Sequence, residues 1–365
     1  MIPLPLCLVK LIEHLSAEGI KAIFVGGFVR DYFTGHATAD LDIELYGVTS
    51  LEALETLLRP FGKLGLYGKS FGVLKLSYEG YSIDFAPPRT ESKSGFGHKG
   101  FEVLWVSELD FASAARRRDF TINAIGYDPI TQSLLDPYNG VGDLNAKILR
   151  CVDPETFVDD PLRILRAIQF AARFTLTCDE QLLLLCQSMI AKGALEELPK
   201  ERIFEEIKKL LILSNTPSIG LRLLESFGGR RLFGVFDEEA WDETLTRVDQ
   251  LAQQTYDTPQ ERLTFLLAAL LLHCDDPIGV LERITFHHSL AMRVLKIIMH
   301  ARKWGTLSQP PIPLLMGRDL IAHGLSPSES FKTILDAAYE AQLNQLFSSR
   351  DQALVWLKRY LVTES

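Results

Sequence analysis

Short apolar runs separated by polar and glycine-containing segments fill the first 145 residues. These runs are bounded by Gly, Pro, Asp or Asn, which is the usual punctuation of β-strands. Strands are predicted at 21–27, 40–47, 73–78, 81–87, 101–106 and 122–129. Apolar residues recur every three or four positions at 5–18 and 50–59, which predicts helices. Strands mixed with few helices indicate an α+β domain built on a sheet.

From about residue 155 the apolar pattern becomes almost wholly helical. The predicted helices lie within 160–174, 179–198, 201–213, 217–227, 259–273, 290–304 and 326–343. No fixed-period repeat is visible, which argues against a solenoid. A proline-rich stretch at 305–320 is predicted to be a hinge before the last helical piece. The chain therefore reads as a compact α/β head followed by an extended helical body.

Composition and charge narrow the class of protein. Hydrophobic residues make up 47% and charged residues 23% of the 365 positions, as in ordinary soluble proteins. No apolar run is long enough for a membrane span, and the N-terminus reads as an amphipathic helix rather than a signal peptide. The formal charge of −9 argues against a nucleic-acid coat protein but is compatible with an enzyme whose basic residues are concentrated on one face. Five scattered cysteines without CxxC spacing favour reduced thiols in the cytoplasm and argue against structural zinc.

Two aspartates interrupt the predicted strand in "FVGGFVRDYFTGHATADLDIEL", residues 24–45. Residues i and i+2 of a strand point to the same face, so Asp40 and Asp42 converge. Neighbouring carboxylates stay ionised together only when cations neutralise them, and Mg²⁺ is commonly held by one or two carboxylates plus substrate phosphates. The alternative is a strand end whose aspartates simply face water.

The glycine pair Gly26–Gly27 follows the apolar run "AIFV" and precedes a predicted helix, "FVRDYF". A strand–Gly-Gly–helix turn lets backbone N–H groups approach a triphosphate, and the helix N-terminus adds positive potential. Arg30 would lie in the first helical turns, within reach of the phosphates. An ordinary tight turn is the other interpretation, but the combination with the D-x-D pair is far more specific than either motif alone.

This combination resembles the head motif of class II tRNA nucleotidyltransferases and bacterial poly(A) polymerases, which belong to the polymerase-β-like superfamily. The resemblance continues in order along the chain, from residue 20 to about 215 and more loosely at 317–331. The matching segments are "RRRDFTINAIGYDP" at 116–129, "LLDPYNGVGDLNAKILR" at 134–150, "DDPLRILRAIQFAARF" at 159–174 and "ERIFEEIKKLL" at 201–211.

The resemblance implies a polymerase-β-like nucleotidyltransferase head with a mixed sheet, followed by an extended all-helical neck, body and tail. The predicted parts are the head at 1–145, a neck for base recognition at 146–215, a body at 216–305 and a tRNA-binding tail at 306–365. A glycine-, serine- and lysine-rich segment at 89–103 is expected to be a mobile loop. In the family, a flexible loop in this region helps to switch the pocket from C to A.

Family resemblance also implies two-metal phosphoryl transfer, which needs a carboxylate cluster. Asp40 and Asp42 are the predicted Mg²⁺ ligands and catalytic residues. Asp84 in "YSIDFAP" is the candidate third carboxylate, with an ordinary strand-edge aspartate as the alternative. Glu44 shares the face of the first two but lies farther along the strand, so it ranks below Asp84.

Base selection is predicted for Asp160 and Arg163, which are three residues apart in a predicted helix and so share a face. A carboxylate accepts from an exocyclic amine and a guanidinium donates to the adjacent ring nitrogen. Cytosine and adenine fit that pair, whereas uracil and guanine do not. A surface salt bridge between the two residues is the alternative.

Four further residues follow from the resemblance. It assigns Arg118 and Arg166 to nucleotide contacts, whereas Asp119 and Asn123 are expected to support the site by hydrogen bonding.

Two positions depart from the family pattern. Asp159–Asp160 replaces the usual Glu-Asp, and Gln169 replaces the usual third arginine of the R-x-x-R-x-x-R ladder, which could weaken triphosphate binding or alter nucleotide preference.

The function implied is template-independent addition of CCA, or part of it, to tRNA 3′ ends. The expected partners are the tRNA acceptor end, ATP and CTP, with no membrane; the sequence leaves the oligomeric state open. An A-adding enzyme and a poly(A) polymerase share the same chemistry. A non-catalytic RNA-binding paralogue and a transferase acting on small molecules are alternatives of other classes, although the last would not need the long helical body.

Overall fold

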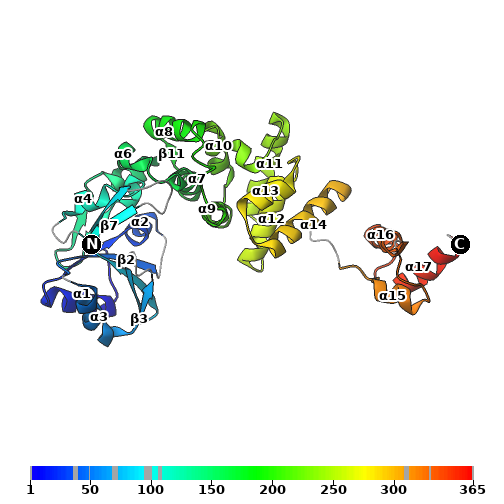
Figure 1. The fold of residues 1–365 in the computed structure, drawn as a ribbon, viewed down its shortest axis with the longest axis horizontal. Coiled ribbons are helices and arrows are strands. Elements are labelled where there is room, and N and C mark those ends of the chain that lie inside the picture. The colour runs from blue at the N-terminus through cyan, green and yellow to red at the C-terminus, as the bar shows by residue number, and fades with distance from the viewer. Residues whose placement is uncertain are drawn as a thin grey trace. The chain divides into compact units, whose positions relative to one another are not determined.

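The computed structural model describes residues 2–35, 40–48, 50–67, 73–93, 101–105, 109–307, 312–328 and 330–363. The chain forms two compact units, Met1–Ile298 and Met299–Ser365. Strands gather in the N-terminal part of the first unit and helices make up most of the rest (Figure 1). The predicted α+β class is therefore confirmed. The four predicted parts of the chain, with boundaries after residues 145, 215 and 305, stay predictions.

A seven-stranded mixed sheet forms the centre of the head, in the order β3-β4-β5-β2-β1-β8-β9. Strand β2 runs antiparallel to β1 and parallel to β5, so the predicted mixed sheet is confirmed. The strands are β1 (Lys21–Val25), β2 (Asp40–Tyr46), β3 (Lys63–Tyr67), β4 (Val73–Tyr78), β5 (Tyr81–Ala86), β8 (Gly126–Asp128) and β9 (Ser133–Leu135).

Strand β2 shows how the sequence pattern sets the two faces of this sheet. Leu41, Ile43 and Leu45 are each about 1% exposed and pack into the core. The alternating residues, Asp40, Asp42 and Glu44, must then lie on the other face.

The head helices are α1 (Leu6–Ala17), α2 (Gly27–Thr34), α3 (Leu51–Leu58), α4 (Phe111–Ala115) and α5 (Gly140–Ala146), with single 3₁₀ turns at Arg59–Phe61 and Thr121–Asn123.

The segment predicted as a mobile loop, 89–103, contains regular structure. Strands β6 (Arg89–Lys93) and β7 (Phe101–Trp105) pair antiparallel in a sheet of their own. The expectation of a loop is therefore wrong for these residues, because backbone pairing overrides a polar composition that by itself disfavours a strand. Residues 94–100 lie outside the described residues.

Helices dominate the rest of the first unit, as predicted. They are α6 (Pro154–Phe157), α7 (Leu162–Phe174), α8 (Glu180–Ala191), α9 (Lys200–Leu213), α10 (Ser218–Ser226), α11 (Glu238–Ala252), α12 (Pro259–Leu271), α13 (Pro277–Ile284) and the start of α14 (His288–Trp304), with a 3₁₀ turn at Arg230–Phe233. A short departure from the all-helical expectation is β11 (Thr177–Cys178), which pairs in parallel with β10 (Ile148–Leu149).

Helix α7 positions several of the predicted site residues. Its apolar residues Ile164, Leu165 and Ile168 are fully buried, and the helix packs against α9 and α10. Asp160 does not lie in the helix as predicted, because α7 begins at Leu162. Its Oδ1 instead accepts a hydrogen bond from the Leu162 backbone N–H at 3.1 Å, so the carboxylate satisfies one free donor of the first helical turn.

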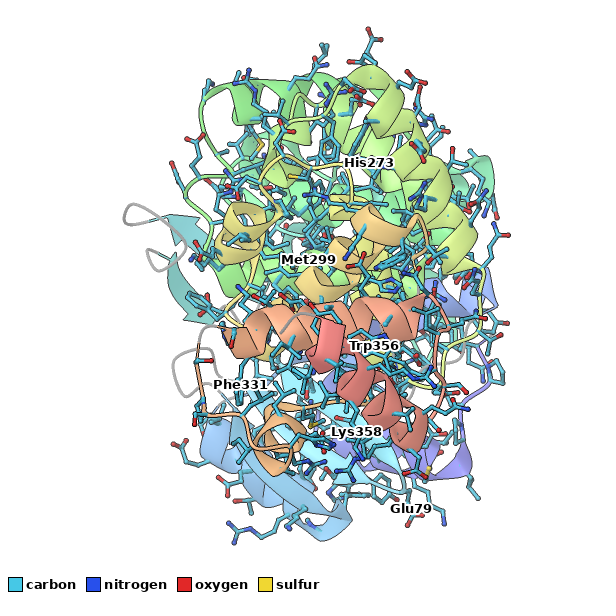
Figure 2. The ribbon with its side chains drawn as sticks, turned by 90° about the vertical axis from the view of Figure 1, so that its right-hand side faces the viewer. Glu79, His273, Met299, Phe331, Trp356 and Lys358 are labelled. Atoms are coloured by element: carbon cyan, nitrogen blue, oxygen red, sulfur yellow. The ribbon has the colours of Figure 1, made fainter. Side chains whose placement is uncertain are left out.

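The second unit contains the end of α14 and helices α15 (Gly317–Ala322), α16 (Ser330–Leu343) and α17 (Arg350–Thr363). Its core is apolar and includes Leu320, Ala353 and Leu357. Trp356 and Lys358, marked in Figure 2, both lie on α17, and the Trp356 ring stacks on Tyr360 with centroids 4.8 Å apart. Part of the predicted hinge, 308–311, lies outside the described residues.

In the described parts of both units, no helix has the length and apolar character needed to cross a membrane.

Candidate nucleotide-binding site

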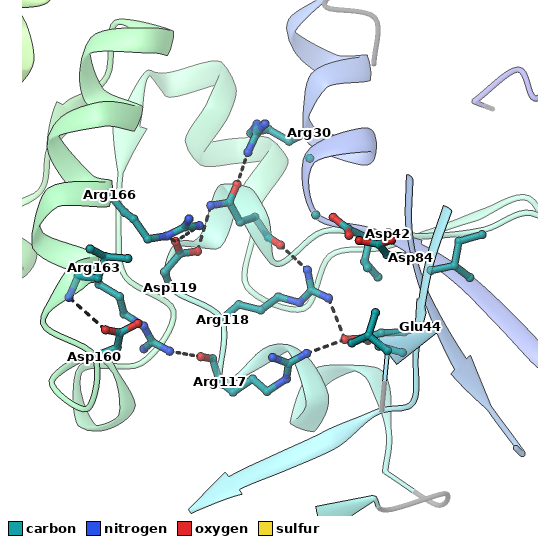
Figure 3. Close-up of a pocket in the computed structure, with 18 of the residues that line it drawn as sticks. Arg30, Asp42, Glu44, Asp84, Arg117, Arg118, Asp119, Asp160, Arg163 and Arg166 are labelled. Atoms are coloured by element: carbon teal, nitrogen blue, oxygen red, sulfur yellow. Dashed lines mark hydrogen bonds and ion pairs between the residues drawn. The ribbon is translucent and has the colours of Figure 1, made fainter. Parts of the chain in front are cut away.

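A pocket of about 500 Å³ opens between the sheet of the head and helices α7 and α9 (Figure 3). Its lining brings together most of the predicted site residues: Gly26, Gly27, Arg30, Asp42, Asp84, Arg118, Asp119, Asn123, Asp160, Arg163 and Arg166. Asp40 is exposed at the first residue of β2 and is not part of this lining. Residues from five separate sequence segments thus face one cavity.

The carboxylates of Asp42 and Asp84 lie side by side on neighbouring strands. The parallel register of β2 and β5 pairs Asp42 directly with Asp84. Directly opposed residues project from the same face of a sheet, as the close-up shows for this pair (Figure 3). Asp40, two residues before Asp42, belongs to the same face. The sheet register therefore supplies the proximity that spacing alone could not establish for Asp84.

Electrostatics make Asp42 an unusual carboxyl group. Its side chain can be reached by solvent, yet protein atoms enclose much of it, and this desolvation raises its pKa above the usual value. The positive charge of Arg118 lowers the pKa, while the charges of Asp84 and Asp40 raise it. Negative charges this close favour a bound cation, which would remove the repulsion.

Gly26 lets the backbone turn tightly beside Asp42. It follows β1 with φ 66° and ψ −130°, a conformation that only glycine adopts readily. A Cβ at this position would lie 3.2 Å from Asp42 Oδ2 and 3.6 Å from Arg118 Nη1. The turn therefore needs glycine both for its conformation and for the space that it leaves beside the carboxylate.

Glu44 holds two arginines at the pocket wall instead of joining the aspartates. Its Oε1 accepts hydrogen bonds from Arg118 Nη2 at 2.8 Å and from Arg117 Nη2 at 3.2 Å. Burial raises the pKa of Glu44, but the charges of Arg118 and Arg117 outweigh it and leave the pKa below its usual value. Glu44 is therefore a buried counter-ion to these arginines, as Figure 3 shows.

A buried hydrogen-bond chain links the head to α7. Asp119 Oδ2 accepts a hydrogen bond from Arg166 Nε at 2.6 Å, and Arg166 Nη2 lies 2.6 Å from the same oxygen, so this is a close charge-assisted pair. Asp119 Oδ1 accepts from Asn123 Nδ2 at 3.0 Å, and Asn123 Oδ1 accepts from Arg30 Nη1 at 2.6 Å. Burial raises the pKa of Asp119, yet Arg166 and Asn123 leave it below its ordinary value.

Arg30 lies deeper than the sequence suggested. Its side chain is about 6% exposed, with Nη2 2.6 Å from Asp31 Oδ1. Its guanidinium lies over the rings of Phe170 and Phe174 of α7, at 5.1 and 4.8 Å from the ring centres. This burial lowers the pKa of Arg30. The side chain thus connects α2 to α7, and a phosphate contact by Arg30 stays a prediction.

Asp160 and Arg163 line the same pocket but contact other partners. Asp160 Oδ2 accepts from Arg202 Nη2 of α9 at 2.8 Å. Arg163 donates from Nη1 to the Thr156 carbonyl at 2.8 Å and from Nη2 to the Arg117 carbonyl. These bonds fix both groups and leave further lone pairs and N–H donors for a ligand.

Gln169, at the position where the family usually has arginine, is buried in α7 and about 2% exposed. Its Nε2 has no hydrogen-bond partner among the described residues. Gln169 is not part of the pocket lining, so the structure adds no direct nucleotide contact at this position.

Sequence reasoning missed three site residues: Lys75, Arg117 and Arg202. Arg117 stands in the quoted "RRRDF" cluster and Arg202 in "ERIFEEIKKLL", so a signal existed for both. Their partners, Glu44 and Asp160, are 73 and 42 residues away. Only the fold establishes such pairs. Lys75 gave no sequence signal beyond being a charged residue inside an apolar strand.

The donor set at the carboxylates fits a divalent ion. Asp40, Asp42 and Asp84 offer only carboxylate oxygens, the ligands that Mg²⁺ and similar hard ions prefer. Asp84 Oδ1 is buried and accepts no hydrogen bond from the described residues, and its ion-pair contact is Lys75 Nζ at 3.2 Å. Within the described ranges, no three His, Cys, Asp or Glu side chains form a ready-made metal site, so water or substrate oxygens would supply the remaining ligands of an ion there.

Comparisons with known proteins agree with this geometry. Residues 22–150 match the family described as poly A polymerase head domain. Proteins with this nucleotidyltransferase head depend on divalent metal ions in general, and the carboxylates on the sheet of the head domain are the residues here that suit such ions.

Relatives and solved structures extend the similarity beyond the poly(A) polymerase head domain. The multifunctional CCA protein of Stenotrophomonas maltophilia is 38% identical over 208 residues, which cover 56% of this chain and 49% of that protein. The predicted resemblance to class II tRNA nucleotidyltransferases and poly(A) polymerases is thereby confirmed. The match spans about half the length of that relative.

Two solved structures share the fold over nearly the whole chain. The Thermotoga maritima CCA-adding enzyme complexed with tRNA has a TM-score of 0.66 at 22% identity, covering 96% of this chain and 94% of that one. A CCA-adding enzyme in complex with CTP has a TM-score of 0.67 at 22% identity, covering 99% and 96%. The helical region after the head therefore follows the fold of these enzymes.

Proposed function

We propose that this chain is a template-independent RNA nucleotidyltransferase that adds CCA, or its terminal A, to tRNA 3′ ends from CTP and ATP. The observation that carries the proposal is the single pocket in which Asp42 and Asp84 of the sheet face Asp160 and Arg163 beside α7. The similarity to CCA-adding proteins supports the same conclusion. A protein with this proposed role would act in the cytoplasm.

The carboxylate row is the proposed reaction centre. Asp40 and Asp42, with Asp84 opposite Asp42, would hold Mg²⁺, which would supply Lewis-acid stabilisation of the triphosphate and activate the RNA 3′-hydroxyl. The new bond joins that oxygen to the α-phosphate, and pyrophosphate leaves. The aspartates fix where the phosphate can sit, because all of them project from one face of the rigid sheet.

The phosphates would lie against the turn at Gly26–Gly27 and the arginines behind it. Gly27 begins α2, so its N–H belongs to a helix N-terminus, where anions bind favourably. Arg117 and Arg118 project toward the same space and are held there by Glu44. Their positive charge would offset the triphosphate, while Arg166 is oriented by Asp119.

Base choice would depend on Asp160 and Arg163. The Asp160 carboxylate can accept from the amine of cytosine or adenine, and Arg163 can donate to the neighbouring ring nitrogen. Uracil and guanine would place a carbonyl against the carboxylate and an N–H against the guanidinium. A bound uracil or guanine would leave the Asp160 carboxylate and the Arg163 guanidinium without hydrogen-bond partners, so it would bind more weakly than cytosine or adenine. The pocket would therefore select the base without a template.

An incorporation assay tests this function. Three tRNA transcripts, ending at the discriminator base, after CC and after CCA, are each offered CTP, ATP, UTP or GTP with Mg²⁺. Addition of CTP and then ATP that stops at CCA establishes a CCA-adding enzyme. Addition of ATP to the CC-ended transcript alone indicates an A-adding enzyme, and long A tails indicate a poly(A) polymerase. A folded protein that binds tRNA but incorporates nothing contradicts the proposal.

A further inference from the structure

A lysine shares the carboxylate face of the sheet and was given no role by the sequence. Antiparallel pairing of β4 and β5 sets Lys75 directly opposite Asp84, and Asp84 is in turn opposite Asp42 on β2. The three side chains therefore form one row across three neighbouring strands. We call Asp42, Asp84 and Lys75 the sheet row.

The position of Lys75 is fixed by the packing of its neighbours. Leu74 and Leu76 are fully buried and pair with Phe85 and Ile83 on the core side of the sheet. A shift of one residue would expose both leucines and bury the lysine, so the register that sets Lys75 beside Asp84 is strongly specified.

The ammonium group of Lys75 occupies one side of Asp84. Its Nζ lies 3.2 Å from Asp84 Oδ1, and both side chains are 37% exposed. The charge of Lys75 also reaches Asp42, whose pKa it lowers slightly against the raising effect of Asp84. Lys75 therefore relieves part of the repulsion within the sheet row.

A divalent ion bound between the aspartates would approach the carboxylate that already pairs with Lys75. Ammonium and metal ion carry charge of the same sign, so each weakens the binding of the other at Asp84. Breaking the ion pair should cost little, because ion pairs whose side chains are more than a third exposed to solvent are weak. Lys75 is thus close enough to compete and bound weakly enough to be displaced.

We propose that Lys75 is a built-in counter-ion that competes with divalent metal ions for Asp84, so that Asp84 joins the metal site only when Lys75 is displaced. This inference rests on the proposed function, because it takes the aspartates of the sheet to be the metal ligands. Lys75 would then set the divalent-ion concentration that the protein requires.

Manganese binding tests the proposal without nucleotide or tRNA. Free Mn²⁺ is measured from its electron paramagnetic resonance signal during titration of wild type, Lys75→Met and Lys75→Arg. Lys75→Met keeps an unbranched apolar stem and should bind Mn²⁺ about two- to fivefold more tightly, the factor that corresponds to an ion pair of this exposure. Lys75→Arg keeps the charge and should bind like wild type. Unchanged or weaker binding by Lys75→Met overturns the proposal.

Lys63→Met is the matched control. Lys63 lies on the neighbouring strand β3, opposite Ser77, one strand farther from the aspartates. Its substitution should leave Mn²⁺ affinity unchanged, and an equal gain in both variants would mean that only overall charge matters, which contradicts the proposal. Thermal melts of each variant confirm that it is folded.

A double-mutant comparison addresses Asp84 directly. Asp84→Asn should reduce Mn²⁺ affinity more in the Lys75→Met background than in wild type, since Lys75 already occupies Asp84 in wild type. Additive effects would overturn the competition. The competition by Lys75 and the proposed nucleotidyltransferase function can fail separately. If wild type incorporates nucleotides but Lys75→Met does not bind Mn²⁺ more tightly, only the competition by Lys75 is contradicted. Tighter Mn²⁺ binding without any incorporation removes the proposed function alone.

Discussion

The carboxyl group of Asp42 shows how one residue's surroundings can be suited to a cation. Partial desolvation raises its pKa, and Asp84 and Asp40 raise it further, while Arg118 opposes them. In the metal-free protein the ionised form is therefore disfavoured. The stability cost of ionising Asp42 appears as the pH rises through its raised pKa, and a bound divalent ion would remove that cost.

The pH dependence of metal binding follows from this shift. Metal ligands must be deprotonated, so Mn²⁺ affinity should fall as the pH drops through the raised pKa of Asp42, earlier than for an ordinary aspartate with a pKa of 3.8. Arg118→Gln removes the charge that lowers this pKa, so its acid limb should move to higher pH. Titrations of both proteins at a series of pH values measure the effect. Coincident acid limbs would contradict it.

Glu44 offers a test of buried charge pairing. Glu44→Gln leaves Arg117 and Arg118 without their counter-ion, and loss of one partner of a buried pair costs about 3–5 kcal/mol in the free energy of unfolding. Nucleotide binding should weaken as well, since the arginines lose their fixed positions. Urea denaturation measures the first effect and the KM for ATP the second.

Glu55→Gln is the control for Glu44→Gln. Glu55 pairs with Arg59 on the surface at 3.3 Å, and such a pair is worth at most about 1 kcal/mol. Equal destabilisation by the two substitutions would show that Glu44 is not a buried counter-ion.

At the residue scale, the sequence predicted the identity of the pocket residues better than their contacts. Asp42, Asp84, Asp160 and Arg163 all line the pocket, because local motifs mark such residues. Their partners could not be predicted, since Asp160 meets Arg202 across 42 residues of chain. Spacing within one element is readable from sequence, whereas register and helix packing between distant elements are not.

At the scale of elements, the backbone conformation of the turn from β1 to α2 determines the space beside the Asp42 carboxylate. Gly26→Ala should lower the free energy of unfolding by about 1–3 kcal/mol, because alanine is strained at this φ and ψ. Its Cβ would also press on Asp42 Oδ2 at 3.2 Å, so Mn²⁺ binding and nucleotide incorporation should fall steeply.

Gly35→Ala separates strain from function at the other end of α2. Gly35 has φ 73°, and a Cβ there would meet nothing within 4 Å. Alanine should cost about 1–2 kcal/mol of stability while leaving Mn²⁺ affinity unchanged. If both variants bind Mn²⁺ like wild type, Gly26 does not shape the metal site.

Elements with a strong local pattern were predicted well. Strands β1, β2, β4 and β5 alternate or run apolar between clear breakers, and α7 repeats its apolar residues at helical spacing. Strands β3 and β6 were missed, since β3 contains Gly65 and β6 reads "RTESK". Both depend on pairing with a neighbouring strand, which a single segment cannot reveal.

At the scale of the whole molecule, buried carboxylates couple folding to pH. Glu44 and Asp119 are buried, yet their arginine partners hold each pKa below its ordinary value. They therefore contribute stability that is present above the unfolded-state values of 4.5 and 3.8 and is lost as the pH falls toward the folded-state values. Urea denaturation of the first unit within the full chain should show stability falling in this acid range.

Glu44→Gln should flatten that pH dependence, because one of the two linked groups no longer titrates. The comparison is made between slopes, so the lower stability of the variant does not obscure it. An unchanged slope would mean that other carboxylates cause the acid loss.

The order of a strand-rich part followed by a helical part could be predicted, because the spacing of apolar residues changes along the chain. The switch from strands to helices near residue 150 is visible in the apolar spacing and is present in the structure. The division into compact units after Ile298 has no comparable sequence signal, because it falls within the helical pattern of α14.

In the proposed function, one pocket of the protein distinguishes the four bases by itself. Equilibrium binding of CTP, ATP, UTP and GTP to the full chain with Mg²⁺ and without tRNA tests it most directly. Wild type should bind CTP and ATP roughly tenfold or more tightly than UTP and GTP, and Asp160→Ala should remove that preference. Equal affinity for all four nucleotides in wild type, or an unchanged preference in Asp160→Ala, would contradict the account.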